Sequence, residues 1–158
     1  MSSRKIAPKP SLRLWLQLMK CTKTVEAHVG GQLRRKHNQS LARFDVLSQL
    51  FRVDGDWATI GEVAEQLMAS GGNITGLLDR MESEKLVLRR ASPSDRRSYQ
   101  VKMTPSGRKL FLNMTRDHDK WITDMLADLP GQDKEHLIEL LIQVRRAFEP
   151  AVDKRSAA

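Results

Sequence analysis

The spacing of apolar residues predicts a mainly helical chain with one small β-hairpin. In six segments, apolar side chains recur at steps of three and four residues, the period that gives a helix one buried face. These segments are 11–36, 41–52, 60–68, 71–85, 105–129 and 133–148. Short strand-like stretches at 57–59, 86–91 and 99–103 predict an edge strand and a hairpin.

Local start signals support these boundaries. Thr59 stands three residues before Glu62, the spacing of a capping box, and Ser70 is a residue type that caps the helix after it. Thr104-Pro105 places a capping residue before a proline at the first helical position, where the missing N–H costs nothing. Two short helices joined at 69–70 are typical of a helix-turn-helix, and the hairpin that follows makes the unit a winged helix.

The two ends of the chain predict a dimerisation layer. A helix over 11–36 would be roughly 39 Å long at 1.5 Å per residue, too long for one small domain to cover. We therefore expect a mainly α (α+β) fold that is one compact domain overall. It would have a basic arm at 1–10, a helical dimerisation region at 11–37 and 105–150, and a winged helix-turn-helix DNA-binding region at 38–104. Two-fold symmetry would place two recognition helices roughly 34 Å apart, which matches a pseudo-palindromic site.

Positive charge is concentrated near the N-terminus. The formal net charge is +8, from 27 Lys and Arg against 19 Asp and Glu. Residues 1–36 hold nine basic residues and one acid, which leaves 18 basic and 18 acidic residues in the rest of the chain. The excess favours nucleic acid as a partner. A DNA site in the middle of the chain must nevertheless rest on local clusters, and the N-terminal charge would contact flanking phosphates or hold an acidic effector.

Other classes of protein are disfavoured by missing motifs. There is no run of 18 apolar residues and no signal peptide, so we expect a cytoplasmic protein with no membrane partner. The single cysteine, Cys21, excludes an internal disulfide and a thiolate zinc site, and we expect it to be a buried structural thiol and not a peroxide sensor. The histidines form no His-x-x-x-His pair, so we predict no metal and no other cofactor. Without a Gly-rich phosphate loop or a Gly-x-Ser-x-Gly elbow, an enzyme is not expected.

Four motifs follow one another between residues 72 and 107. Residues 72–81 end in Asp79-Arg80-Met81, 85–90 read Lys-Leu-Val-Leu-Arg-Arg, 95–97 read Asp-Arg-Arg, and 103–107 read Met-Thr-Pro-Ser-Gly. In this order they resemble the recognition helix, first wing strand, wing tip and fifth-helix entry of the MarR family of bacterial transcription regulators. The resemblance spans 12–148 and implies a dimeric winged-helix regulator. Two departures are Met103 in place of leucine and Lys85 where a glycine often closes the recognition helix.

The exposed N-terminal half of the recognition helix is the part expected to enter the major groove, where base edges distinguish sequences. It comprises Ser70, Gly71, Gly72, Asn73, Thr75 and Gly76. The Asn73 amide suits adenine, and the Thr75 hydroxyl and methyl suit a phosphate or a thymine. The glycines would let the backbone approach DNA closely, with the helix N-terminus facing a phosphate. The alternative interpretation is that 70–72 form only a turn and that Asn73 is a solvated cap.

The hairpin carries the second group of predicted DNA contacts. Its candidates are Arg89, Arg90, Asp95, Arg96 and Arg97, which together give +3 within nine residues. The resemblance implies that Arg97 enters the minor groove and that Asp95 orients it, and a narrow A·T-rich groove attracts arginine. Arg96 is expected at a phosphate. We assign Asp79 and Arg80 mainly to holding the recognition helix against the wing. The alternative interpretation of the tip is a solvated polar turn.

The resemblance also implies a cleft for a small aromatic or anionic effector, such as an aromatic acid or its coenzyme A thioester. Trp15, Met19 and Phe44 are candidates for its apolar wall, although a helical aromatic stripe is more often ordinary core. The function we predict is a homodimeric, nucleoid-associated repressor that binds double-stranded DNA at a specific operator and is released by such an effector. The alternatives are a ligand-independent activator or anti-repressor and a non-specific architectural DNA-binding protein.

Overall fold

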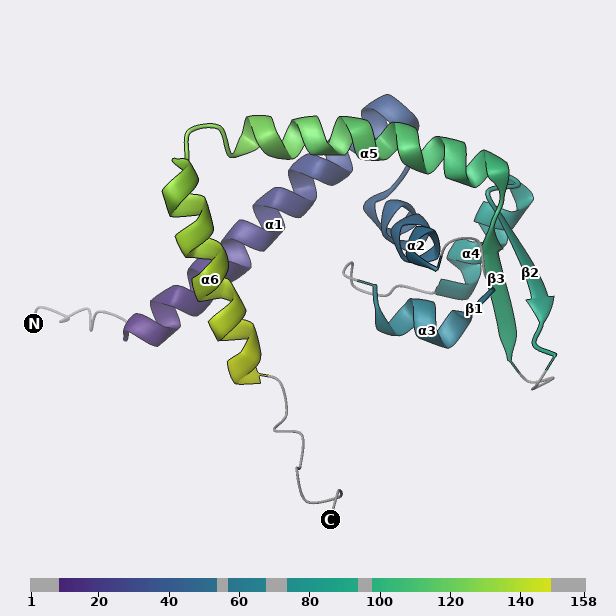
Figure 1. Cartoon of the computed structure of the whole chain (residues 1–158), viewed down its shortest axis with the longest axis horizontal. Coiled ribbons are helices and arrows are strands. Elements are labelled where there is room, and N and C mark those ends of the chain that lie inside the picture. Colours follow the sequence, from purple (N-terminus) through teal and green to yellow (C-terminus); the bar gives the residue numbers. More distant parts are fainter. Residues whose placement is uncertain (1–8, 54–56, 68–73, 94–97, 149–158) are drawn as a thin grey trace, which may run out of the picture. The chain divides into compact units, whose positions relative to one another are not determined.

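The computed structural model describes residues 9–53, 57–67, 74–93 and 98–148 and contains the predicted elements in the predicted order (Figure 1). The helices are α1 (Pro10–His37), α2 (Leu41–Arg52), α3 (Ile60–Glu65), α4 (Ile74–Ser83), α5 (Pro105–Met125) and α6 (Gly131–Phe148). The strands are β1 (Ala58–Thr59), β2 (Val87–Ala91) and β3 (Tyr99–Met103). The predicted fold class, a mainly helical winged helix with a small antiparallel sheet, is confirmed.

The sheet and four helices enclose one hydrophobic core. Strand β3 pairs with both β1 and β2, antiparallel in each case, with Val101 opposite Ala58 on one side and Arg89 on the other. Fully buried apolar side chains come from α1, α2, α4, both long strands and α5. They are Leu33, Val46, Leu47, Leu50, Leu78, Met81, Val87, Val101 and Met114. The core therefore fixes α4 and the wing to one another through α2 and the first half of α5.

Three helices end earlier than predicted: α3, α5 and, by two residues, α4. Helix α3 ends at Glu65 and not at Met68. The Gln49 side chain donates a hydrogen bond to the Gln66 carbonyl at 2.9 Å, and Gln66 N donates to Val63 O at 3.3 Å, which makes the last turn tighter than an α-helical turn. Helix α5 ends at Met125, after which the backbone forms i to i−3 bonds such as Ala127 N to Asp124 O. Short-range bonds of this kind satisfy the last carbonyls of a helix and stop its propagation. The predicted start of α4, with its Ser70 cap, lies outside the described residues.

The end of α4 explains one departure from the family pattern. Lys85 has a φ of 59°, the left-handed region, while Leu86 N donates to Met81 O at 2.9 Å and Lys85 N donates to Glu82 O at 2.8 Å. These two bonds make a Schellman motif, whose left-handed position is normally glycine. A lysine there carries the Cβ that makes this conformation unfavourable.

Replacing Lys85 with glycine should therefore stabilise the protein. We expect Lys85→Gly to raise the free energy of unfolding by about 1 kcal/mol. The midpoint of thermal unfolding, followed by circular dichroism, should rise by about 2–4 °C for a chain of this size. Lys85→Ala removes the same charge but keeps a Cβ, so its midpoint should not rise; an equal gain in both variants would argue that charge and not backbone strain is responsible.

The chain divides into two compact units, residues 1–119 and 120–158. In the first unit the N-terminal half of α1 exposes Leu12, Leu14, Trp15, Leu16 and Met19. In the second unit α6 has no buried residue and exposes Leu137, Ile138, Leu140 and Leu141. Cys21 on α1 is also exposed, so its predicted burial is wrong for the single chain. No helix within the described ranges has the length and apolar content needed to cross a membrane.

Candidate nucleic-acid interface

Helix α4 presents a polar face outward from the core. Leu78 and Met81 are buried, whereas Thr75, Asp79 and Arg80 are exposed. Of the predicted base-contacting residues, Thr75 and Gly76 lie in the first described turn of this helix, and Ser70, Gly71, Gly72 and Asn73 lie outside the described residues. The exposed face of α4 is thus available to a groove, as a recognition helix requires.

One flank of α4 is tied to the wing by ion pairs. The Arg89 guanidinium on β2 lies 2.5 Å from Asp79 Oδ1 and 2.9 Å from Glu82 Oε2, and Arg89 N donates to Glu82 Oε1 at 2.9 Å. Burial lowers the pKa of Arg89, but its hydrogen bonds to Glu82 and Asp79 outweigh burial and the pKa is raised. The predicted role of Asp79 in holding α4 against the wing is confirmed.

This pairing gives Arg89 a role that differs from the predicted DNA contact. Its charge is compensated by two carboxylates of α4, and its side chain is only 21% exposed. Arg89 therefore positions the recognition helix relative to the wing, while its contact with DNA stays a prediction. Glu82 was missed by the sequence analysis, since nothing local indicates which arginine it meets.

We expect Arg89→Met to weaken operator binding about tenfold, because the wing and α4 lose the ion pairs that set their mutual geometry. The dependence of affinity on salt separates positioning from contact: loss of a phosphate contact would lower the slope of log K against log salt by about one per subunit, or about two for a dimer. An unchanged slope with weaker binding supports positioning, measured by fluorescence anisotropy. Arg89→Lys keeps the charge but lacks the planar guanidinium group, so its operator affinity should lie between those of the wild type and Arg89→Met.

Arg90, the next wing residue, is held in place on the opposite side of the strand. Its guanidinium lies 4.1 Å from the centre of the Trp57 ring, and its Nε donates to Gln100 Oε1 at 3.0 Å. Arg90 is exposed and has no carboxylate partner in the described part of the chain, so its charge is available to an anion. The cation–π contact limits the freedom of the side chain before any partner binds. Asp95, Arg96 and Arg97 lie outside the described residues.

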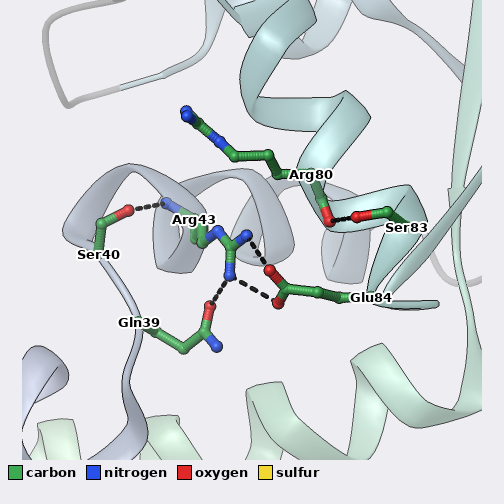
Figure 2. Close-up of polar contacts among 6 residues, drawn as sticks. All are labelled: Gln39, Ser40, Arg43, Arg80, Ser83 and Glu84. Atoms are coloured by element: carbon green, nitrogen blue, oxygen red, sulfur yellow. Dashed lines mark hydrogen bonds and ion pairs between the residues drawn. The ribbon is translucent and has the colours of Figure 1, made fainter.

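The other flank of α4 is tied to α2 (Figure 2). Arg43 binds both oxygens of Glu84, just past the end of α4, at 2.6 and 2.8 Å, and it also donates to Gln39 Oε1 at 2.9 Å. The hydrogen bonds that Glu84 accepts from Arg43 hold the pKa of Glu84 below its usual value. Ser40 caps α2 by accepting from Arg43 N at 3.3 Å. Among the described residues no ion pair ties Arg80 to the wing; its side chain lies on this second flank, so the role predicted for it is not seen there.

The wing is joined to α5 at a crowded turn. Leu86 O accepts from Thr104 N and from Thr104 Oγ1, each at 3.1 Å, and Gly107 N donates to Thr104 Oγ1 at 2.9 Å. A Cβ on Gly107 would lie 2.1 Å from Leu86 O. This explains the glycine of the fifth-helix motif, because only a residue without a side chain allows α5 to approach the end of the recognition-helix unit so closely.

The residues predicted to line an effector cleft do not meet within one chain. Phe44 packs against Phe111 at 5.5 Å and stacks on His118 at 5.0 Å between ring centres, and burial lowers the pKa of His118. Trp15 and Met19 are exposed on the first half of α1. Gly30 is the α1 residue that lies next to Leu41 at the start of α2. Trp15 lies about 23 Å before Gly30 along the helix axis. A wall built from Trp15 and Phe44 would need a second chain.

Helices α1 and α5 are linked near Phe44 by a small ion-pair cluster. Asp117 binds Lys36 Nζ at 2.6 Å and His37 Nε2 at 2.8 Å. The Lys36 hydrogen bond, followed by that of His37, holds the pKa of Asp117 below its usual value despite some desolvation. The described residues contain no group of three or more His, Cys, Asp or Glu side chains arranged to hold a metal ion.

A helix-turn-helix unit with an arginine-bearing hairpin and an outward-facing second helix defines a winged-helix DNA-binding protein. The MarR family model matches residues 40–99. The chain is 28% identical over 134 residues to the HTH-type transcriptional regulator MhqR of Bacillus subtilis, covering 85% of this chain and 90% of that protein. Residues 40–99 match the MarR family and most of the chain resembles HTH-type transcriptional regulators, so the fold and these matches together indicate a MarR-type DNA-binding transcriptional regulator.

Solved structures agree on the fold. Sco3205, a MarR family transcriptional regulator from Streptomyces coelicolor crystallised in complex with DNA, aligns with a TM-score of 0.78 at 17% identity, over 96% of this chain and 95% of that one. Bordetella bronchiseptica BpsR, whose DNA binding is regulated by 6-hydroxynicotinic acid, aligns with a TM-score of 0.68 at 21% identity, over 82% of this chain and 96% of that one.

Proposed function

We propose that the protein is a homodimeric repressor that binds a pseudo-palindromic operator and is released by a small aromatic or anionic effector. The observation that carries the proposal is the double attachment of α4, to the wing through Arg89 and to α2 through Arg43, which presents one rigid reading surface. Rigid support of this kind is what sequence readout requires. It would act in the cytoplasm, associated with the bacterial nucleoid.

The proposed DNA contacts combine α4 with the wing. They are Ser70, Gly71, Gly72, Asn73, Thr75 and Gly76 in the major groove, and Arg89, Arg90, Asp95, Arg96 and Arg97 at the wing. Arg90 supports the wing assignment, because it is exposed, charged and held over Trp57. The test is fluorescence anisotropy with an operator located by footprinting and with a scrambled duplex. A sequence-reading repressor should prefer the operator by more than about 10³, whereas an architectural protein would bind both duplexes alike.

Dimerisation is supported by the uncovered apolar side chains of α1. Leu14 and Trp15 are about half exposed, at 51% and 55%, and a surface of this kind is typical of an interface. Winged-helix proteins that read palindromes bind as dimers. A dimer formed through this surface would therefore match the two-fold symmetry of the proposed operator. The effector part of the proposal is supported by BpsR, a structural neighbour whose DNA binding responds to an aromatic acid.

We expect Trp15→Asp to produce a monomer, because a buried unpaired carboxylate at an apolar interface is strongly unfavourable. Size-exclusion chromatography with light scattering should show half the mass, and circular dichroism should show unchanged helix content. Gln17→Asp places the same charge on the opposite face of α1, about 160° away around the helix, and should stay dimeric. If the Trp15→Asp protein is still a dimer, the dimer interface does not lie on this face of α1.

A further inference from the structure

The small sheet has one face turned away from the core, and an arginine lies across it. Val101 of β3 is buried, so its neighbour Gln100 and the residue paired with Gln100, Arg90 of β2, are on the opposite face, which we call the outer face. Gln100 also pairs with Thr59 of β1, so β3 separates β1 from β2. The Arg90 guanidinium nevertheless lies 4.1 Å from the centre of the Trp57 ring, just before β1. This contact therefore spans the middle strand.

Two contacts fix the orientation of the Arg90 guanidinium. The Trp57 ring covers one side of the group, and Nε donates to Gln100 Oε1 at 3.0 Å. The terminal nitrogens Nη1 and Nη2 meet no acceptor among the described residues. Because Nε is already bonded, the end of the guanidinium, with about four N–H donors, is the part left for a partner. A planar group with several parallel donors suits the oxygens of a phosphate.

The position of Arg90 relative to the recognition helix is also fixed. The preceding residue, Arg89, is on the inner face of the sheet and binds Asp79 and Glu82 of α4. Arg89 is therefore compensated by two carboxylates, whereas Arg90 forms no ion pair within the part of the chain that the structure describes. Backbone phosphates stand at set distances from the base edges that a recognition helix reads. A cation at a set distance from α4 can thus fix the register of the protein on DNA.

Trp57 changes what a phosphate contact by Arg90 costs. A free arginine side chain loses rotamer freedom when it binds a phosphate, and this loss weakens binding. Here the ring contact and the Nε hydrogen bond restrict Arg90 before DNA arrives. The ring is itself held, because Trp57 is partly buried and the next residue, Ala58, is buried in the sheet. Arg90 is therefore preorganised by a support that belongs to the folded sheet.

We propose that Trp57 is a positioning residue for DNA binding: it holds Arg90 on the outer face of the sheet, and the end of the Arg90 guanidinium binds a phosphate of the DNA backbone. Such a contact adds affinity and orients the wing on the duplex, but it does not distinguish bases. The inference deepens the proposed function and rests on its DNA-binding part. Local sequence patterns do not indicate it, because Trp57 and Arg90 are far apart along the chain.

The test is a double-mutant cycle, with the Kd for the operator duplex measured by fluorescence anisotropy at several salt concentrations. Arg90→Gln should lower the slope of log K against log salt by about two for a dimer, since one phosphate contact per subunit is lost. Trp57→Leu keeps the charge, so it should weaken binding about tenfold with an unchanged slope. In the Arg90→Gln background, Trp57→Leu should cause no further loss, because there is no guanidinium left to hold.

Two further variants separate positioning from general damage to the sheet. Trp57→Phe keeps an aromatic ring under Arg90, so its affinity should lie between those of the wild type and Trp57→Leu. Leu88→Ala is the matched control: it trims an exposed apolar side chain from the same outer face and should leave the Kd within twofold. NMR without DNA checks the contact itself, because the ring current of Trp57 should shift the Arg90 side-chain protons in the wild type and not in Trp57→Leu.

Three results would overturn the proposal. Equal losses from Trp57→Leu in the wild-type and Arg90→Gln backgrounds would mean that Trp57 acts only on the stability of the sheet. An unchanged salt slope in Arg90→Gln would mean that Arg90 meets no phosphate. Arg90 proton shifts that are the same in the wild type and in Trp57→Leu would contradict the ring contact. If the wild type binds operator and scrambled duplex alike, the repressor function fails instead, and the same cycle on either duplex still decides the role of Trp57.

Discussion

Gly107→Ala should destabilise the protein by about 2–4 kcal/mol, because the added methyl group has no room beside a backbone carbonyl. The new Cβ would lie 2.1 Å from Leu86 O and 3.1 Å from Met103 Cγ. A backbone carbonyl cannot rotate away as a flexible side chain can. The first turn of α5 must therefore move, and the bonds from Thr104 to Leu86 O lengthen or break.

Urea unfolding followed by circular dichroism measures this effect directly. The thermal midpoint should fall by about 4–16 °C, at 2–4 °C per kcal/mol for a chain of this size. Gly61→Ala is the control: it adds the same methyl to helix α3, where the nearest atom, Thr59 Oγ1, is 4.0 Å away. That variant should be as stable as the wild type or slightly more stable, since alanine favours a helix. Equal midpoints for the two variants would contradict the proposed crowding at Leu86.

Arg97→Ala should have the largest effect on operator binding. An arginine in a narrow minor groove meets an enhanced negative potential, and a specific contact of this kind contributes about 1–3 kcal/mol. A dimer makes the contact twice, so the expected loss is about 2–6 kcal/mol, or roughly 30-fold to 10⁴-fold in affinity. Fluorescence anisotropy at moderate salt, with the footprinted operator, measures the change.

Arg96→Ala separates the two neighbouring arginines of the wing tip. It removes the same charge, but from a predicted phosphate contact, so it should weaken binding to the operator and to a scrambled duplex to the same extent. Arg97→Ala should instead reduce the preference for the operator. If affinity for the operator is unchanged in Arg97→Ala, the minor-groove assignment of the wing tip is wrong.

Helix α4 is held on two flanks. Arg89 joins α4 to the wing, and Arg43 joins the residue just past its end to α2.

The sequence by itself determined the elements, their order and the resemblance to MarR family regulators. Helix α2 was predicted at its observed bounds from its apolar spacing and from the turn-forming residues after Arg52, which act within a few residues of the helix. The capping box of Thr59 and Glu62 was likewise predicted and is present. These signals are local, so a pattern of neighbouring residues is enough to reveal them.

Only the tertiary structure decided which charges meet. Arg43 and Glu84 are 41 residues apart, and nothing near either residue indicates the other. Arg89 was predicted to contact DNA, and its two carboxylate partners on α4 became visible only once the hairpin was packed beside that helix. Packing sets such distances through the whole core, whereas periodicity and capping depend on short-range geometry alone.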